Sequence, residues 1–281
     1  MTEAVGVIGG GTMGVGIAYV SAIAGYDVHV AEPDDAQAAA MVQTIATTLD
    51  GAVARGKLSG DAREAAAASI HRVAAIEALP AELAVLVESV PERLDLKRDV
   101  LARAAARSPR LLATNTSAMS IDTLAQSVAD PSRFLGLHFF NPVWSLKLLE
   151  IVVGAATTDA ALADARAFGA AIGKEVITVR DVPGFATSRL DFAAALEAMR
   201  MLEDGVASAE DIDRAAVLAY RHPVGPLRLS DIVGLDVRLE VARTLEAAHG
   251  SRFAPPAILS TMVAEGRLGA KSGRGFFDWP A

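Results

Sequence analysis

A glycine-rich segment near the start of the chain has the spacing of a phosphate-binding turn. Residues 9–14, Gly-Gly-Gly-Thr-Met-Gly, satisfy the pattern G-x-G-x-x-G between a short apolar run and a helix-compatible stretch. In that setting Gly9 permits a tight turn, Gly11 lets the backbone approach a pyrophosphate, and Gly14 lets the helix pack close to the strand. The first helical turn then offers N–H groups and a positive dipole end to the phosphates. The segment predicts a dinucleotide site made by Gly9, Gly11, Thr12, Met13 and Gly14; a glycine turn without a ligand is the alternative.

An acidic residue follows the next strand-like run. Residues 26–31 alternate and are rich in β-branched side chains, and Glu32 comes directly after them, 23 positions beyond Gly9. A carboxylate about 20 residues past the first glycine hydrogen-bonds the adenosine ribose and repels a 2′-phosphate. Pro33, Asp34 and Asp35 follow it, with no arginine among them. The sequence therefore favours NAD over NADP, and a solvated Glu32 is the alternative.

One of the five histidines lies where an acid–base group is expected. His138 ends the apolar run 134–138, and ligands of open α/β sheets bind beyond the carboxyl ends of the strands. A dehydrogenase needs a group that takes the hydroxyl proton as hydride leaves, and histidine titrates near working pH. Three of the other histidines, His29, His71 and His249, are predicted to be structural or solvated. His222 could be either functional or structural, and a structural role is favoured.

The elements that must position these residues alternate along the chain as far as residue 181. Apolar runs predict strands, those at 70–74 and 83–88 buried, with helices between them at 34–55, 62–69, 94–107 and 160–172. This alternation predicts an α/β fold, a Rossmann-like domain with a mostly parallel sheet covered on both faces, over residues 1–182. Residues 183–281 are predicted to form an all-helical C-terminal domain with helices at 189–204, 209–220, 230–247 and 255–265. Ser208 is the expected N-cap of the helix at 209–220.

Composition excludes several classes of protein. The net charge of −8 argues against nonspecific nucleic-acid binding. The absence of cysteine excludes disulfides, thiolate metal sites and a cysteine nucleophile, and we expect no metal. We also expect no membrane helix, because no run of 18 apolar residues is free of polar interruption. Residues 1–3 lead straight into a strand-like run without a basic segment, so we expect no secretory signal and a cytoplasmic protein.

Several ordered motifs resemble one known family. They are residues 7–14; 88–92 leading to Lys97; 115–117; 136–142; 149–152; 181–185; 225–226 with 231–236; and 271–276. Over nearly its whole length the chain resembles the L-3-hydroxyacyl-CoA dehydrogenases, particularly the bacterial 3-hydroxybutyryl-CoA dehydrogenases. The resemblance implies NAD-dependent oxidation of an (S)-3-hydroxyacyl-CoA to the 3-ketoacyl-CoA, and the reverse, in fatty acid metabolism. It also implies a homodimer formed through the helical domain.

The resemblance implies a role for each matching residue. His138 matches the catalytic histidine, Glu150 the carboxylate that orients it and stabilises its charged form, and Ser117 the serine that hydrogen-bonds the substrate oxygen. Ser117 would otherwise be a helix cap before residues 121–125. Lys57 matches the helical arm that touches the CoA phosphates, and a solvated turn lysine is an equal alternative. Contacts to the cofactor are implied for Glu92, Lys97, Asn141 and Lys271.

One position departs from the family pattern. Ser188 stands where the family usually has an asparagine that positions the substrate carbonyl and the cofactor. Serine keeps one hydroxyl but lacks the two N–H donors and the carbonyl of the amide. We expect Ser188 to act through a bridging water, to mark a different substrate, or to slow turnover. We expect activity to survive.

Three alternatives to a short-chain acyl-CoA remain open. The substrate could be another acyl-CoA such as 3-hydroxyadipyl-CoA, or a free 3-hydroxy acid, as in gulonate and carnitine dehydrogenases. The chain could also be a non-catalytic NAD-binding protein of the crystallin kind. The Lys57 arm favours CoA thioesters, and His138 with Glu150 argues against the non-catalytic alternative.

Overall fold

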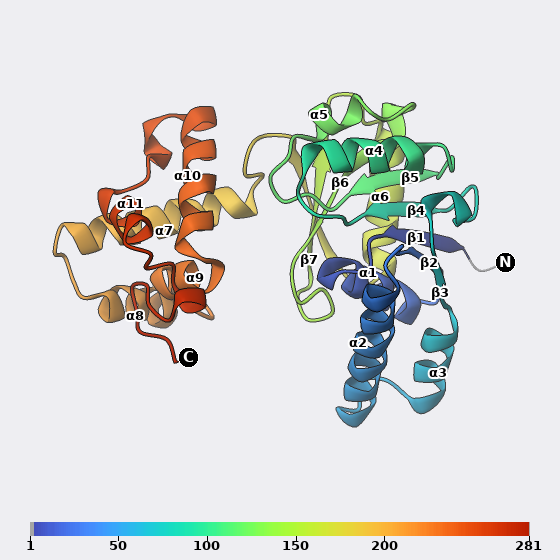
Figure 1. The fold of residues 1–281 in the computed structure, drawn as a ribbon, viewed down its shortest axis with the longest axis horizontal. Coiled ribbons are helices and arrows are strands. Elements are labelled where there is room, and N and C mark those ends of the chain that lie inside the picture. The colour runs from blue at the N-terminus through green and yellow to red at the C-terminus, as the bar shows by residue number, and fades with distance from the viewer. Residues whose placement is uncertain (1–2, 281) are drawn as a thin grey trace. The chain divides into compact units, whose positions relative to one another are not determined.

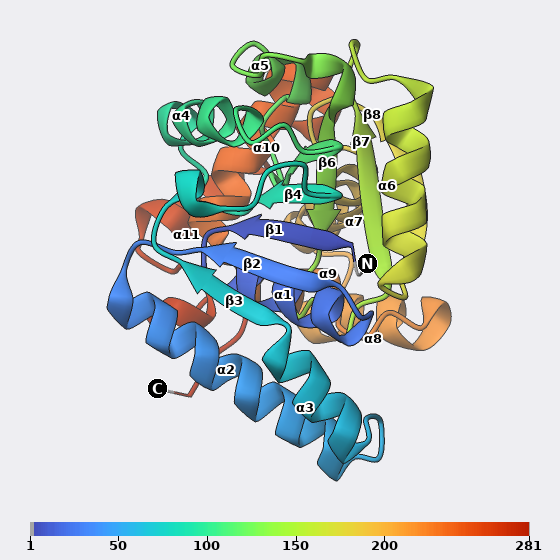
Figure 2. The same cartoon turned by 90° about the vertical axis from the view of Figure 1, so that its right-hand side faces the viewer.

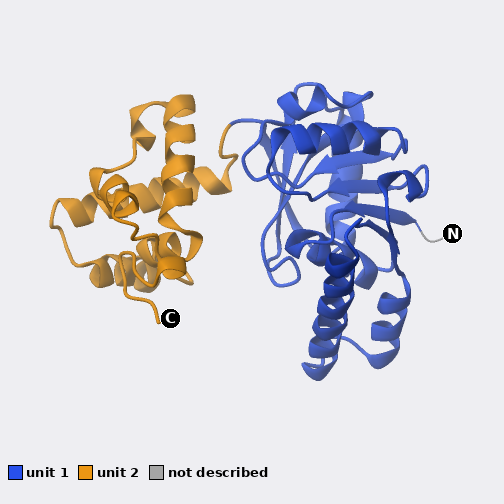
Figure 3. Ribbon diagram, viewed as in Figure 1, with its two compact units in different colours: residues 1–182 blue, residues 183–281 orange. Residues whose placement is uncertain are grey.

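The computed structural model describes residues 3–280. These residues form two compact units, which divide between Val182 and Pro183 (Figures 1 and 3). Residues 1, 2 and 281, at the outer ends of the two predicted domains, lie outside the described part. None of the helices in the described part is both long and apolar enough to cross a membrane.

The first unit is built on one eight-stranded sheet (Figure 2). The strand order is β3-β2-β1-β4-β5-β6-β7-β8, and β6 with β7 is the single antiparallel pair among the strands of this sheet. The predicted mostly parallel sheet is thus confirmed. The strands are β1 (Ala4–Ile8), β2 (Asp27–Ala31), β3 (Ile70–Val73), β4 (Val85–Glu88), β5 (Leu111–Thr114), β6 (Phe134–Phe139), β7 (Leu148–Val153) and β8 (Glu175–Arg180).

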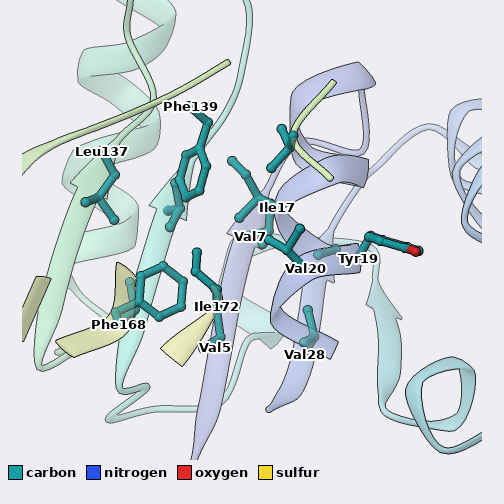
Figure 4. Close-up of a cluster of buried hydrophobic side chains, with 14 of the residues drawn as sticks. Val5, Val7, Ile17, Tyr19, Val20, Val28, Leu137, Phe139, Phe168 and Ile172 are labelled. Carbon is teal, nitrogen blue, oxygen red and sulfur yellow. The ribbon is translucent and has the colours of Figure 1, made fainter. Parts of the chain in front are cut away.

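Helices cover both faces of the sheet. Side chains of β1 and β6 meet Ile17 and Phe168 in one core cluster under α1 and α6 (Figure 4). Because side chains alternate along a strand, Leu86 and Leu112 point to the other face, where α4 and α5 contact β4 and β6. The helices are α1 (Thr12–Ile23), α2 (Asp35–Ala54), α3 (Gly60–Ala68), α4 (Leu94–Ala105), α5 (Ile121–Ala125) and α6 (Asp159–Ala171), with short 3₁₀ turns η1 (Ile76–Ala78) and η2 (Pro131–Arg133).

Helices α2 and α3 lie side by side and form a helical hairpin (Figures 1 and 2). Asp34 caps α2 by accepting from the amide of Gln37, and Ser59 caps α3 by accepting from Ala62. The hairpin is joined by residues 55–59, which include Lys57.

The edge strand β3 differs from its prediction. We expected a buried strand, but His71 and Arg72 are exposed because β3 pairs only with β2 and ends the sheet. The Nε2 atoms of His29 and His71 lie 3.0 and 2.8 Å from the two carboxylate oxygens of Asp27. These two histidines are therefore structural, as predicted.

The second unit is helical, as predicted, and has its own core. Ser208 caps α8 by accepting from the amide of Asp211 at 3.2 Å, which confirms the expected cap. Its elements are α7 (Thr187–Glu203), α8 (Ala209–Tyr220), α9 (Pro226–Val233), α10 (Leu235–His249) and α11 (Ala257–Ala264), with 3₁₀ turns η3 (Ser251–Phe253) and η4 (Ala270–Ser272).

One predicted helix of this unit is wrong. Residues 230–247 were expected to be continuous, but Gly234 separates α9 from α10 with φ of +105°. That conformation suits glycine and interrupts a helix. Near the end of α10, His249 lies 2.9 Å from the carbonyl oxygen of Pro183, so it is structural as predicted.

A buried carboxylate in the second unit binds the segment 276–279 through hydrogen bonds. Asp231 is fully buried on α9 and accepts hydrogen bonds from the amides of Phe276 and Phe277 and from the Trp279 indole, each at 2.9 Å. A buried charge is tolerated only when hydrogen bonds replace its hydration. Asp231 is therefore the link that orders residues 276–279 against the helices.

We predict that Asp231→Ala lowers the free energy of unfolding by about 3 kcal/mol, because three donors lose their acceptor. The matched control is Asp278→Ala, which removes an exposed carboxylate paired with Arg274. Chemical denaturation followed by circular dichroism measures both. Equal stability of the two variants would contradict the role given to Asp231.

Candidate active site

The glycine turn joins β1 to α1 in the predicted way. Gly9 has φ of +102°, and its amide donates to the carbonyl of Ala31 at 2.9 Å. A Cβ on Gly14 would lie 1.8 Å from the Gly9 carbonyl oxygen, whereas a Cβ on Gly11 would meet no protein atom within 4 Å. Gly11 precedes α1 without a side-chain cap, so the first turn of the helix presents its amides to a ligand.

Glu32 is tied to this turn. The side chain is 8% exposed, and its two oxygens accept from the amides of Gly10 at 2.8 Å and Asp34 at 2.9 Å. Gln37 donates to the Gly10 carbonyl at 2.9 Å from the start of α2. Five of the predicted cofactor residues line one cavity of about 670 Å³, namely Gly9, Gly11, Thr12, Met13 and Glu32.

An arginine does lie beside Glu32, although it is distant in sequence. Arg72 comes from β3, and its Nε donates to the Glu32 carbonyl at 2.9 Å. Its guanidinium pairs with Asp35 at 2.7 Å. Asp35 thus offsets the charge that would otherwise attract a 2′-phosphate at this strand end.

His138 and Glu150 face each other across the antiparallel pair. The register of β6 and β7 puts the two residues opposite one another, and Nδ1 of His138 lies 2.9 Å from Oε2 of Glu150. His138 is 7% exposed and Glu150 is fully buried. The Phe140 ring lies 4.4 Å from the imidazole, centroid to centroid. The strand pairing therefore orients the histidine, and the Glu150 carboxylate beside Nδ1 favours the tautomer with its proton on Nδ1.

Ser117 lies in a loop held by a carboxylate. Oε1 of Glu92 accepts from the Thr116 hydroxyl and from the amides of Ser117 at 3.3 Å and Ala118 at 3.4 Å. Ser120 caps α5, with its hydroxyl accepting from the amide of Thr123 at 3.1 Å. The alternative interpretation of Ser117 as the helix cap is therefore wrong.

Lys97 is almost completely buried. It is 1% exposed, and its Nζ donates to Oε1 of Glu88 at 2.8 Å and lies 3.2 Å from Oε2 of Glu92.

Asn141 follows β6 in an exposed loop. Lys174 fixes that loop by donating to the carbonyls of Val143 and Leu146, and its burial lowers the pKa of its ammonium.

Lys57 borders a second cavity of the first unit. The cavity measures about 430 Å³, and its walls include Tyr19 and Trp144, whose rings meet edge to face at 5.7 Å. Arg55 and Lys57 supply two cations to the same cavity. An aromatic wall beside cations suits a phosphorylated nucleoside.

Ser188 and Lys271 belong to the second unit. Ser188 is in the first turn of α7 and is half-buried. Lys271 lies in η4, where its Nζ donates to Asp236 at 2.6 Å and lowers the pKa of that carboxyl. Their contacts with substrate and cofactor stay predictions.

Two family models match the chain. Residues 4–182 match the 3-hydroxyacyl-CoA dehydrogenase NAD-binding domain, and residues 184–279 match the C-terminal domain of the same family. The chain belongs to the 3-hydroxyacyl-CoA dehydrogenase family. The resemblance stated from the sequence is thus confirmed, and the cavity beside the glycine turn lies in the NAD-binding domain.

Relatives from the family match this chain over nearly its whole length. The 3-hydroxybutyryl-CoA dehydrogenase of Mycobacterium tuberculosis is 39% identical over 99% of this chain and 98% of its own. A 3-hydroxyadipyl-CoA dehydrogenase of Escherichia coli is 37% identical over 99% of this chain and 59% of its own. The crystal structure of (S)-3-hydroxybutyryl-CoA dehydrogenase from Ralstonia eutropha has a TM-score of 0.95 at 35% identity and covers 100% of both chains.

Sequence reasoning gave no role to several residues that support the site of this 3-hydroxyacyl-CoA dehydrogenase. Arg55 and Trp144 reach the second cavity from different elements, and Arg72 reaches Glu32 from the edge strand. Glu88 and Thr116 support the site from buried positions. Glu88 and Thr116 lie within motifs that resemble the family, but type and spacing alone assigned them no role, because each side chain acts through tertiary contacts.

Two glycine substitutions separate folding from cofactor binding. We predict that Gly14→Ala lowers the free energy of unfolding by about 2 kcal/mol, because its Cβ would overlap the Gly9 carbonyl. Gly11→Ala changes it by less than about 1 kcal/mol, the scale of a helix cap. Both weaken NADH binding in a fluorescence titration, Gly11→Ala because its methyl occupies the cavity. If Gly11→Ala bound NADH as tightly as wild type, the cofactor phosphates would have to bind away from Gly11.

Proposed function

We propose that this family member oxidises a short-chain (S)-3-hydroxyacyl-CoA, such as 3-hydroxybutyryl-CoA, with NAD and also catalyses the reverse reduction. The observation that carries the proposal is the buried His138–Glu150 pair in a domain that matches an NAD-binding family model. The relatives named 3-hydroxybutyryl-CoA dehydrogenase support a short acyl group on the substrate.

The pair supplies the proton chemistry. His138 takes the proton of the 3-hydroxyl group while the hydrogen on C3 leaves as hydride, and the C–O bond becomes a carbonyl. NAD, when bound, accepts that hydride. Glu150 holds Nδ1 of the imidazole, so Nε2 is the atom that exchanges the proton with the substrate. The carboxylate also stabilises the imidazolium that forms, which a buried neutral neighbour would not do.

Other residues complete the proposed site. Ser117 hydrogen-bonds the substrate oxygen, and Ser188 helps to position the substrate carbonyl. Glu92 and Asn141 contact the nicotinamide half of the cofactor, and Glu32 binds the adenosine ribose. Lys271 supplies a cofactor contact from the second unit. The support is their match to the family motifs, together with the hydrogen bond that the amide of Ser117 donates to Glu92. The first unit thus binds the cofactor, and the second contributes to substrate binding and dimerisation.

The CoA thioester is supported by the cavity at the helical hairpin. Arg55 and Lys57 face it with two cations, and Trp144 offers an aromatic surface for the base. Neither a free hydroxy acid nor a non-catalytic NAD-binding protein needs such a feature. The matched relative named 3-hydroxyadipyl-CoA dehydrogenase makes a dicarboxylic acyl-CoA the second candidate.

A homodimer is the assembly we propose. Large apolar side chains are exposed on the second unit, among them Leu190, Leu218, Tyr220 and Ile232. Exposed apolar surface of this kind is typical of protein interfaces. Cytoplasmic location and a place in fatty acid metabolism stay predictions that follow from the sequence and the family.

Replacement of the histidine tests the chemistry. With acetoacetyl-CoA, we expect wild-type protein to oxidise NADH faster than NADPH and His138→Gln to lower kcat by about 10³-fold, the usual size of a general acid–base effect. Its dissociation constant for NADH should stay near wild type. The control is His222→Gln, at an exposed position of the second unit. Wild-type protein that binds NADH but reduces no 3-ketoacyl-CoA or free 3-keto acid would favour the non-catalytic alternative.

Removal of the hairpin cations tests the thioester. We expect Arg55→Ala/Lys57→Ala to raise KM for acetoacetyl-CoA at least tenfold with kcat unchanged, since each charged hydrogen bond contributes about 1.5 kcal/mol or more. With acetoacetyl-pantetheine, which lacks the nucleotide, the variant and wild type should behave alike. Arg214→Ala, in the second unit, is the control. An equal rise in KM for both substrates would show that the cations do not bind the nucleotide.

A further inference from the structure

A buried lysine connects three of the elements that support the site. Lys97 is on α4, Glu88 ends β4, and Glu92 lies in the segment between them. Nζ of Lys97 donates to Glu88 at 2.8 Å and to the carbonyl of Val90 at 3.3 Å, and it lies 3.2 Å from Glu92. These three oxygens surround the ammonium of Lys97, and the residue as a whole is 1% exposed.

The carboxylate of Glu88 is satisfied from every side. Oε1 accepts from Lys97 and from the amide of Val90 at 2.8 Å, and Oε2 accepts from the Thr114 hydroxyl at 2.7 Å. Glu88 is fully buried. A buried charge that loses its partner is strongly unfavourable, so this pair has one well-defined geometry.

The network extends from Lys97 to the loop of Ser117. One oxygen of Glu92 meets Lys97, and the other accepts from the Thr116 hydroxyl and from the amides of Ser117 and Ala118. The Thr116 hydroxyl in turn accepts from the amide of Met119 at 2.9 Å. A shift of the ammonium would therefore move Glu92 and, through it, the backbone that carries Ser117.

We infer that Lys97 is a positioning residue: with Glu88 it holds Glu92 in place and thereby sets the position of Ser117. This role differs from the cofactor contact that the family resemblance implies for Lys97, because its ammonium is surrounded by protein oxygens. The inference rests on the proposed function, in which Ser117 binds the substrate oxygen.

The test uses a pair of substitutions that keeps the interior neutral. Lys97→Met alone leaves the Glu88 charge buried without its cation and is expected to unfold the protein in part. Lys97→Met/Glu88→Gln removes both charges at similar volume, a change that buried ion pairs often tolerate. The matched control is Lys147→Met, an exposed lysine 3.9 Å from Glu175.

Amide hydrogen exchange is the first measurement, since it needs no turnover. In Lys97→Met/Glu88→Gln we expect the amides of residues 117–119 to exchange at least tenfold faster, while those of β1 and β6 stay as in wild type. Unchanged exchange at 117–119 would overturn the inference. This result stands whether or not the protein reduces acetoacetyl-CoA, so failure of the proposed function is seen separately, as a silent wild-type protein.

Kinetics then distinguish positioning from cofactor contact. We expect the double variant to lose about tenfold or more in kcat with acetoacetyl-CoA. Its affinity for NADH should fall by less than its kcat, because Glu92, a proposed cofactor contact, is displaced but not removed. Ser117→Ala should cost at least tenfold in wild type but less than about twofold in the double variant, because coupled residues are not additive. A tenfold weaker affinity for NADH with unchanged kcat, or fully additive losses with Ser117→Ala, would instead make Lys97 a cofactor contact or an independent residue.

Discussion

The antiparallel pairing of β6 and β7 places His138 directly opposite Glu150, and the rest of the site depends on that register. A shift of β7 by one residue would send Glu150 to the face of the sheet opposite His138. Because β6 is parallel to β5, its carboxyl end lies at the same edge as the ends of β1, β4 and β5. Because β7 runs antiparallel to β6, it places the Glu150 carboxylate at this edge, where the parallel strands have only their carboxyl ends.

The cofactor side of that edge is built from backbone rather than from charge. The close approach of Gly14 to Gly9 leaves no room for a side chain, and Glu32 uses its oxygens to hold the amides of Gly10 and Asp34. The turn is therefore rigid before a ligand binds. Preorganised amides and a fixed carboxylate select a dinucleotide without a large conformational cost.

Local signals in the sequence predicted most of the fold. Strand β1, the glycine turn and the cap at Ser208 follow from residue type and spacing over a few positions. The errors have tertiary causes: β3 is exposed because it ends the sheet, and Gly234 interrupts a helix whose apolar pattern continues through it. His138 was found as a strand-end histidine, whereas Glu150 needed the family, because an antiparallel register has no local sequence signal.

Buried charge explains why the supporting residues were the hardest to predict. A lysine in an amphipathic helix is expected to be solvated, yet Lys97 is buried because Glu88, Glu92 and a carbonyl replace its water. The same principle applies to Glu150, whose buried carboxylate meets an imidazole. In both pairs the cost of an unpaired charge restricts the geometry to one arrangement. Electrostatics therefore underlies both the proton chemistry that we propose for His138 and the rigidity that we infer for the loop of Ser117.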